Sequence, residues 1–106
     1  WVQDSLVVGQ PWKGDVRVVL FVQTVKGVAL DDARRAELRQ TIRSEASPRH
    51  VPTRILSVEG VPYTLSGKKV EIAVREILEG GEPRNKEALA NPEALNYFRD
   101  RKELST

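Results

Sequence analysis

The chain has 106 residues, 40% of them hydrophobic, which is enough for one compact domain with a single core. Its 17 Lys and Arg against 15 Asp and Glu leave a formal charge of +2, which points to neither a nucleic acid nor a membrane surface as partner. Without Cys and with one His, the sequence excludes disulfides and thiolate metal sites, argues against a histidine-based metal site, and is compatible with a reducing, cytoplasmic setting. We expect no metal site in this chain.

Two apolar segments near the N-terminus predict strands. They cover residues 2–8 and 16–23, and the segment 10–15 between them, with Pro and Gly, predicts a loop. The second segment is rich in β-branched residues and alternates incompletely, so we expect it to be a mostly buried central strand. Residues 53–58 predict a third strand, bounded by prolines and a glycine.

A first helix is predicted between the second and the third of these strands. Asp31 or Asp32 can cap its N-terminus, and Pro48 ends it, so it should run to about residue 46. Its apolar residues fall on or near one face, and they are Ala33, Leu38 and Ile42.

Residues 70–78 carry the best helical period in the chain. The apolar positions follow the spacing i, i+3, i+4, i+7 and i+8, and they are Val70, Ala73, Val74, Ile77 and Leu78. Such a stripe normally packs on a sheet, and two glycines at 80 and 81 end the helix. A last short helix is predicted over residues 91–98, with Asn91 as its cap and Pro92 in its first turn.

These elements predict an α+β fold, in which a small sheet of about three strands is covered by helices on one side. Residues 1–80 would form the domain, and residues 81–106 a C-terminal tail with its short helix. No apolar run approaches the roughly 20 residues that span a bilayer, and the N-terminus lacks the pattern of a signal peptide.

The segment 62–69, PYTLSGKK, is the most informative in the chain because it places Lys68 and Lys69 where a helix begins. A helix N-terminus carries about half a positive charge, so lysines are unfavourable there unless an anion binds nearby. Ser66 and Gly67 allow a close approach, from which Lys68 could reach a phosphate or carboxylate as a point charge. The alternative is that both lysines are solvated surface residues.

A second group of cations follows from the first helix. Arg39 and Arg43 lie one helical turn apart, and Arg49 and His50 come just after the helix. Such a group beside a Pro-bounded loop would suit a polyanionic ligand. The alternative is a solvated face that complements the helix dipole, and His50 alone is expected to be structural.

Two runs resemble the C-terminal domain of the adenylate-forming acyl-CoA synthetases. They are residues 47–52, SPRHVP, and residues 61–71, VPYTLSGKKVE, whose Thr-x-Ser-Gly-Lys core is shared across that family. The tail at residues 89–98, LANPEALNYF, is similar to the branch of the family that activates acetoacetate. The resemblance covers nearly the whole chain and implies the mobile lid domain of these enzymes.

The resemblance also implies roles for particular residues. In the family, the lysine after Ser-Gly enters the active site of a large N-terminal domain and stabilises acid and phosphate oxygens during adenylation. Lys68 holds that position, with Thr64, Ser66 and Gly67 as its neighbours in the phosphate loop. The small domain then rotates and presents another face to CoA, and the ungapped spacing implies that Arg43 contacts CoA.

The implied enzyme is a ligase that uses ATP, CoA, Mg²⁺ and a small carboxylic acid, acetoacetate. The chain starts at Trp1 and holds neither a Gly-rich phosphate loop nor a hinge motif, so we expect a portion of a larger polypeptide that binds no cofactor and is inactive alone. Two alternatives stay open: a stand-alone binding or regulatory module of the same fold, or an adenylating domain that loads a carrier protein.

Overall fold

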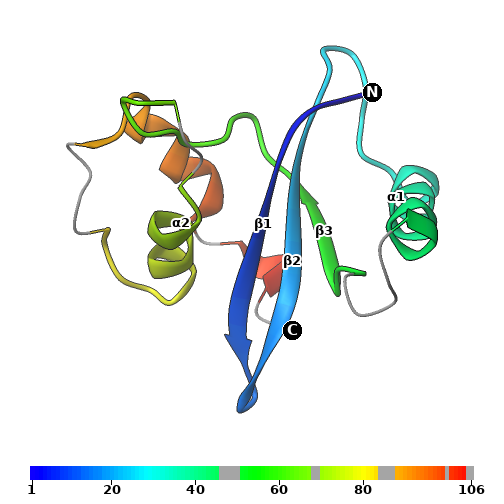
Figure 1. Ribbon diagram of the computed structural model, residues 1–106, viewed down its shortest axis with the longest axis horizontal. Coiled ribbons are helices and arrows are strands. Elements are labelled where there is room, and N and C mark those ends of the chain that lie inside the picture. Colours follow the sequence, from blue (N-terminus) through cyan, green and yellow to red (C-terminus); the bar gives the residue numbers. More distant parts are fainter. Residues whose placement is uncertain (46–50, 68–69, 84–87, 100, 105–106) are drawn as a thin grey trace.

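Three strands form one sheet in the order β1-β2-β3, with helices on both sides of it (Figure 1). The structure is a computed structural model and describes residues 1–45, 51–67, 70–83, 88–99 and 101–104. β1 (Val2–Trp12) and β2 (Asp15–Thr24) are antiparallel, whereas β3 (Arg54–Ser57) pairs with β2 in parallel. The helix α1 (Asp32–Glu45) makes the crossover from β2 to β3. All three predicted strands are therefore present.

The hairpin between β1 and β2 is tighter than the sequence predicts. Trp12 pairs with Asp15, so the turn consists of Lys13 and Gly14 alone, with φ of +50° and +81°. Two successive residues with positive φ are typical of the two-residue turn whose twist matches that of the strands. Residues 10–12, predicted as loop, therefore extend β1, and Pro11 is tolerated because β1 is an edge strand.

Helices cover both faces of the sheet, so the expected one-sided cover is wrong. In Figure 1, α2 (Glu71–Leu78) and α1 lie on opposite sides of the strands. The reason is the composition of β2, where successive side chains point to opposite faces. Val19 and Phe21 belong to the core on the α2 side and Leu20 and Val22 to that on the α1 side, and all four are buried.

The larger core lies between the sheet and α2. Phe21 packs edge to face on Phe98 of the 3-10 helix η3 (Pro92–Phe98), with 4.6 Å between ring centroids. The predicted apolar stripe of α2 is confirmed as core, since Ala73, Val74 and Ile77 are buried and Val70 and Leu78 pack against them.

On the other face, α1 is attached with little burial of its own side chains. Asp31 is the cap, as predicted, and its Oδ1 accepts the backbone N–H of Arg34 at 2.8 Å. None of the helix side chains is fully buried: Leu38 and Ile42 are half-buried against the sheet, and Ala33 is exposed, so only part of the predicted apolar face packs.

Arginines supply the rest of the attachment of α1. Arg35 Nε donates to the carbonyl of Ile55 at 2.9 Å, and Arg39 donates to those of Pro52 and Thr53 at 3.4 Å each. β3 is an edge strand, and its outer backbone groups need partners. Arg35 provides one for β3, and Arg39 holds the two residues before this strand, so part of the predicted cationic group of α1 serves the fold.

The C-terminal segment completes the larger core, on the α2 side of the sheet. Leu95, Phe98 and Leu104 are buried, the last in the 3-10 helix η4 (Lys102–Leu104). The buried Arg17 donates from Nη2 to the Leu104 carbonyl and from Nε to Gln10 Oε1, both at 2.7 Å. Burial, and less so the charge of Arg54, lowers the pKa of Arg17.

No helix among the described residues is long and apolar enough to cross a membrane.

The burial of Ile77 gives a first test. Replacing Ile77, which is 6% exposed, by Ala should lower the free energy of unfolding by about 2–5 kcal/mol, because a cavity is left in the core. Ile72→Ala is the matched control in the same helix: Ile72 is 71% exposed, so its loss should change stability by less than about 0.5 kcal/mol. Urea denaturation of both variants measures this, and equal losses would contradict the assignment of the buried face.

Candidate functional site

The candidate site is the loop over residues 61–67, which leads directly to Lys68. The N–H of Gly67 donates to the carbonyl of Thr64 at 2.9 Å, and the φ of Gly67 is +88°, a conformation that favours glycine. The hydroxyls of Thr64 and Ser66 lie 3.0 Å apart within this turn. Ser66 and Gly67 are exposed, whereas Lys68 and Lys69 lie outside the described residues.

The loop pairs with a segment more than 20 residues further along the chain. Thr64 forms an isolated antiparallel bridge with Leu89. The N–H of Leu65 donates to the carbonyl of Ala88, and the N–H of Ala90 donates to that of Tyr63, both at 2.9 Å. So short a pairing has no period of its own, and the sequence analysis missed it.

Asn91 fastens the base of the loop. Its Oδ1 accepts the N–H of Tyr63 at 2.8 Å, and its Nδ2 donates to the carbonyl of Val61 at 2.9 Å. The predicted role of Asn91 as a helix cap is wrong, because its side chain makes no capping hydrogen bond to η3. Pro92 does stand at the start of η3, as predicted.

Tyr63 ties the loop to the sheet. Its hydroxyl donates a short hydrogen bond to Oδ2 of Asp4 in β1. This hydrogen bond, then partial burial and the negative charge of Asp4, raise the pKa of Tyr63 to about 12. The sequence analysis did not single out either residue, because a tyrosine and an aspartate 59 positions apart give no local signal.

Arg43, the second predicted site residue, does not lie near the loop over residues 61–67. It is in the last turn of α1, which covers the face of the sheet opposite α2 (Figure 1). Tyr63 in the loop and Val70, which follows Lys69, instead pack against the α2-side core. Arg43 is exposed and, among the described residues, has no hydrogen-bond or ion-pair partner. The structure therefore does not bring Arg43 and the loop together. Arg49 and His50 lie outside the described residues.

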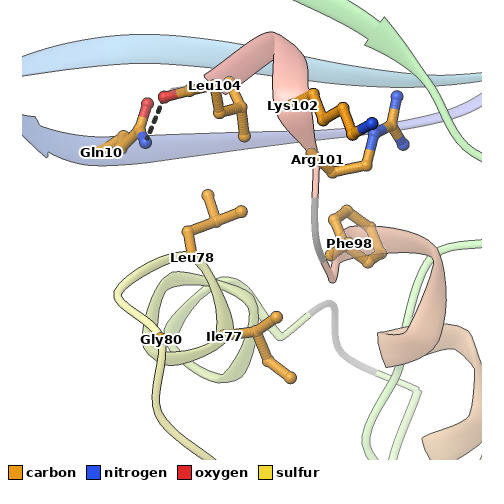
Figure 2. Close-up of a pocket in the computed structure, with 8 residues that line it drawn as sticks. All are labelled: Gln10, Ile77, Leu78, Gly80, Phe98, Arg101, Lys102 and Leu104. Atoms are coloured by element: carbon orange, nitrogen blue, oxygen red, sulfur yellow. Dashed lines mark hydrogen bonds between the residues drawn. The ribbon is translucent and has the colours of Figure 1, made fainter. Parts of the chain in front are cut away.

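A pocket of about 450 Å³ lies at another place on the fold (Figure 2). It lies between the end of α2, η3, η4 and β1, and it is lined by Gln10, Ile77, Leu78, Gly80, Phe98, Arg101, Lys102 and Leu104. None of the predicted site residues lines it. A smaller pocket of about 230 Å³ does border the loop, with Thr64 and Leu89 in its wall.

The described residues include no group of three or more His, Asp or Glu side chains that could hold a metal ion.

Comparison with known proteins connects this geometry to a family. The acetoacetyl-coenzyme A synthetase of Rhizobium meliloti (strain 1021) is 52% identical over 105 residues, which are 99% of this chain and 16% of that protein. The solved acetoacetyl-CoA synthetase from Streptomyces lividans superposes with a TM-score of 0.84 at 32% identity, again over 99% of this chain and 16% of the other. This chain is similar to part of the acetoacetyl-CoA synthetases.

The resemblance predicted from the motifs is thereby confirmed. A benzoate CoA ligase from Burkholderia xenovorans LB400 has the same fold at lower similarity, with a TM-score of 0.64 and 28% identity over 71% of this chain. The fold matches the C-terminal domain of adenylate-forming acyl-CoA synthetases, and the chain spans about 16% of the length of the acetoacetyl-CoA synthetases it matches. No protein-family model matches the chain.

The hydrogen bond from Tyr63 to Asp4 predicts a pH dependence. The pKa of Tyr63 is about 12 in the fold against an ordinary value of 10.0, so folding favours the protonated phenol. The resulting stabilisation is complete below about pH 10 and is lost as the pH rises toward 12. Tyr63→Phe should remove it, so wild type should be the more stable protein at pH 9 and the difference should shrink by pH 11.5. Parallel urea midpoints across this range would contradict the hydrogen bond.

Proposed function

We propose that this chain is the lid domain of an acetoacetate–CoA ligase, working as part of a longer polypeptide in the cytoplasm. The similarity to acetoacetyl-CoA synthetases over 99% of the chain carries this proposal, since it includes the loop before Lys68 and the tail that pairs with it. The chain spans only about 16% of such proteins, so the sites for ATP, Mg²⁺ and the acid would lie in the remainder, and this chain alone would be inactive.

In the first half-reaction, an oxygen of the acetoacetate carboxylate attacks the α-phosphorus of ATP, and the bond to pyrophosphate breaks. Negative charge then redistributes over the phosphate oxygens, where a positioned cation lowers the barrier. We assign this role to the ammonium group of Lys68. The hydroxyls of Thr64 and Ser66, 3.0 Å apart on the exposed turn, would be the neighbouring donors to phosphate.

Two apolar side chains support the insertion of this loop into a partner surface. Leu65 is 74% exposed and Ile72 is 71% exposed, and they stand three and four positions on either side of Lys68 in the sequence. Large apolar side chains that stay in water favour a site where another surface covers them. The large domain of the same polypeptide is the partner we propose.

In the second half-reaction, the thiol sulfur of CoA attacks the acyl carbon of the adenylate, and AMP leaves. The opposite placement of Arg43 and the loop fits a domain that rotates between two working faces, because a single orientation could not present both to one active site. The guanidinium of Arg43 would bind a phosphate of CoA, for which its exposure and its lack of a partner among the described residues leave it available.

The first test asks whether acetoacetate is the acid that is activated and whether Lys68 acts in this step. The polypeptide that carries this chain should catalyse exchange between ATP and pyrophosphate that depends on acetoacetate, and Lys68→Ala should slow this exchange by about 100- to 1000-fold, the usual loss when one transition-state donor is removed. Formation of the thioester from preformed acyl-adenylate should be spared. Lys69→Ala, which removes an equal charge one position away, is the matched control.

Equal slowing by Lys69→Ala, or loss of both half-reactions in Lys68→Ala, would rule out the specific role of Lys68. Absence of exchange in the wild-type polypeptide would reject acetoacetate. Exchange followed by transfer to a phosphopantetheine arm, and not to free CoA, would instead favour an adenylating domain that loads a carrier protein.

Arg43→Ala should raise the KM for CoA by roughly tenfold or more, because a hydrogen bond to a charged group contributes about 1.5–3 kcal/mol. The KM for ATP should stay near the wild-type value. Arg34→Ala is the control on the same helix, since Arg34 pairs with Asp31 at 3.0 Å and lies at the opposite end of α1. Steady-state kinetics with each substrate varied decides this, and unchanged CoA kinetics would remove Arg43 from the site.

A further inference from the structure

We propose that Asn91 is the positioning residue for the loop that carries Lys68, so that the C-terminal segment sets where the catalytic lysine leaves the fold. The catalytic consequence of this inference rests on the proposed function. The anchoring of the loop does not, and it can be tested separately.

The side-chain amide of Asn91 replaces a strand partner that the loop cannot otherwise have. Pro62 has no backbone N–H, so it cannot donate to a neighbouring strand. Asn91 bridges across it, accepting from the N–H of Tyr63 at 2.8 Å and donating to the carbonyl of Val61 at 2.9 Å. One amide thus fixes the backbone on both sides of the proline.

The two hydrogen bonds of the Asn91 amide, here called the Asn91 clamp, have a fixed position because the backbone is held on both sides of Asn91. On its C-terminal side, η3 places Ala94, Leu95 and Phe98 in the core. On its N-terminal side, Ala90 donates to the carbonyl of Tyr63 at 2.9 Å. Removing the Asn91 amide would therefore loosen the backbone around Pro62 and leave the packing of η3 in place.

Hydrogen bonds fix the described residues on both sides of Lys68 and Lys69. The turn from Thr64 to Gly67 is closed by its own 2.9 Å hydrogen bond, and the N–H of Val70 donates to the carbonyl of Pro62 at 3.3 Å, so both ends of the segment are fixed. A displacement of about 1 Å at a reacting group can cost on the order of 100-fold in rate. Both ends of the Asn91 amide are occupied by backbone groups, so Asn91 acts through the loop and not on the substrate.

The test compares Asn91→Ala with Asn96→Ala in the full-length polypeptide. Asn96 is the matched control because it stands in η3, the 3-10 helix that follows Asn91, and is exposed. Its side chain accepts a hydrogen bond from Arg99 at 3.1 Å, within the C-terminal segment itself. Asn91→Ala should lower kcat of acetoacetate-dependent ATP–pyrophosphate exchange by about 10- to 100-fold. Its rate of thioester formation from preformed adenylate, which uses the other face, should stay within about twofold of wild type.

Amide hydrogen exchange of the chain tests the anchoring without any substrate. In Asn91→Ala, the Tyr63 and Leu65 amides should exchange about tenfold faster or more, while the amides of the β1–β2 pair keep their rates. Unchanged exchange at Tyr63 and Leu65 would overturn the proposal. So would equal slowing of both half-reactions, which indicates general destabilisation.

Asn91→Asp is the second variant, in case the alanine variant does not fold. It keeps the size of the side chain and the acceptor for Tyr63 but loses the donor to Val61, so a smaller loss, of roughly 3- to 10-fold in adenylation, is expected. A folded Asp variant with the wild-type rate would overturn the inference. If the wild-type polypeptide shows no acetoacetate-dependent exchange, the proposed acid is wrong, and amide exchange still decides whether Asn91 anchors the loop.

Discussion

The burial of β2 on both faces is the constraint on which the rest of the structure depends. Val19, Phe21 and Val22 have no exposed surface, and Leu20 has 7%, so neither face of this strand can be left to water. Two separate covers follow, with α2 and the C-terminal segment on one side and α1 on the other. The two candidate sites inherit this division, because one adjoins α2 and the other stands on α1.

Different interactions hold the helices to the two faces of the sheet. On the α2 side, a large apolar cluster with the Phe21–Phe98 contact dominates, and the polar clamp of Asn91 works at its margin. On the α1 side, the apolar contact is small, and guanidinium groups donate hydrogen bonds to backbone carbonyls of the edge strand β3 and of the segment just before it. Hydrogen bonds contribute about 1 kcal/mol each, less than the burial of a large apolar cluster, so α1 should open locally before the α2-side core does.

Local patterns predicted much of the fold and little of the scaffold around the site. The β-branched run of β2, the period of α2 and the Asp31 cap all act within one element, and each was found where the sequence placed it. The incomplete alternation of β2 places apolar side chains on both of its faces, and this is why the predicted one-sided cover is wrong. The loop before Lys68 was identified by its motif, whereas its geometry depends on contacts with residues 88–91.

Asn91 shows why contacts between segments far apart in the chain cannot be predicted from local sequence patterns. An asparagine followed by proline at a helix start predicts a cap, and the local pattern is satisfied. The same amide, however, can either bond to the first N–H groups of its own helix or reach another segment. Here the Tyr63 N–H, 28 positions away, and the Val61 carbonyl take both of its polar ends. A backbone interrupted by Pro62 left two groups that needed partners, and satisfying them outweighs one cap at the end of a short 3-10 helix whose burial already holds it in place.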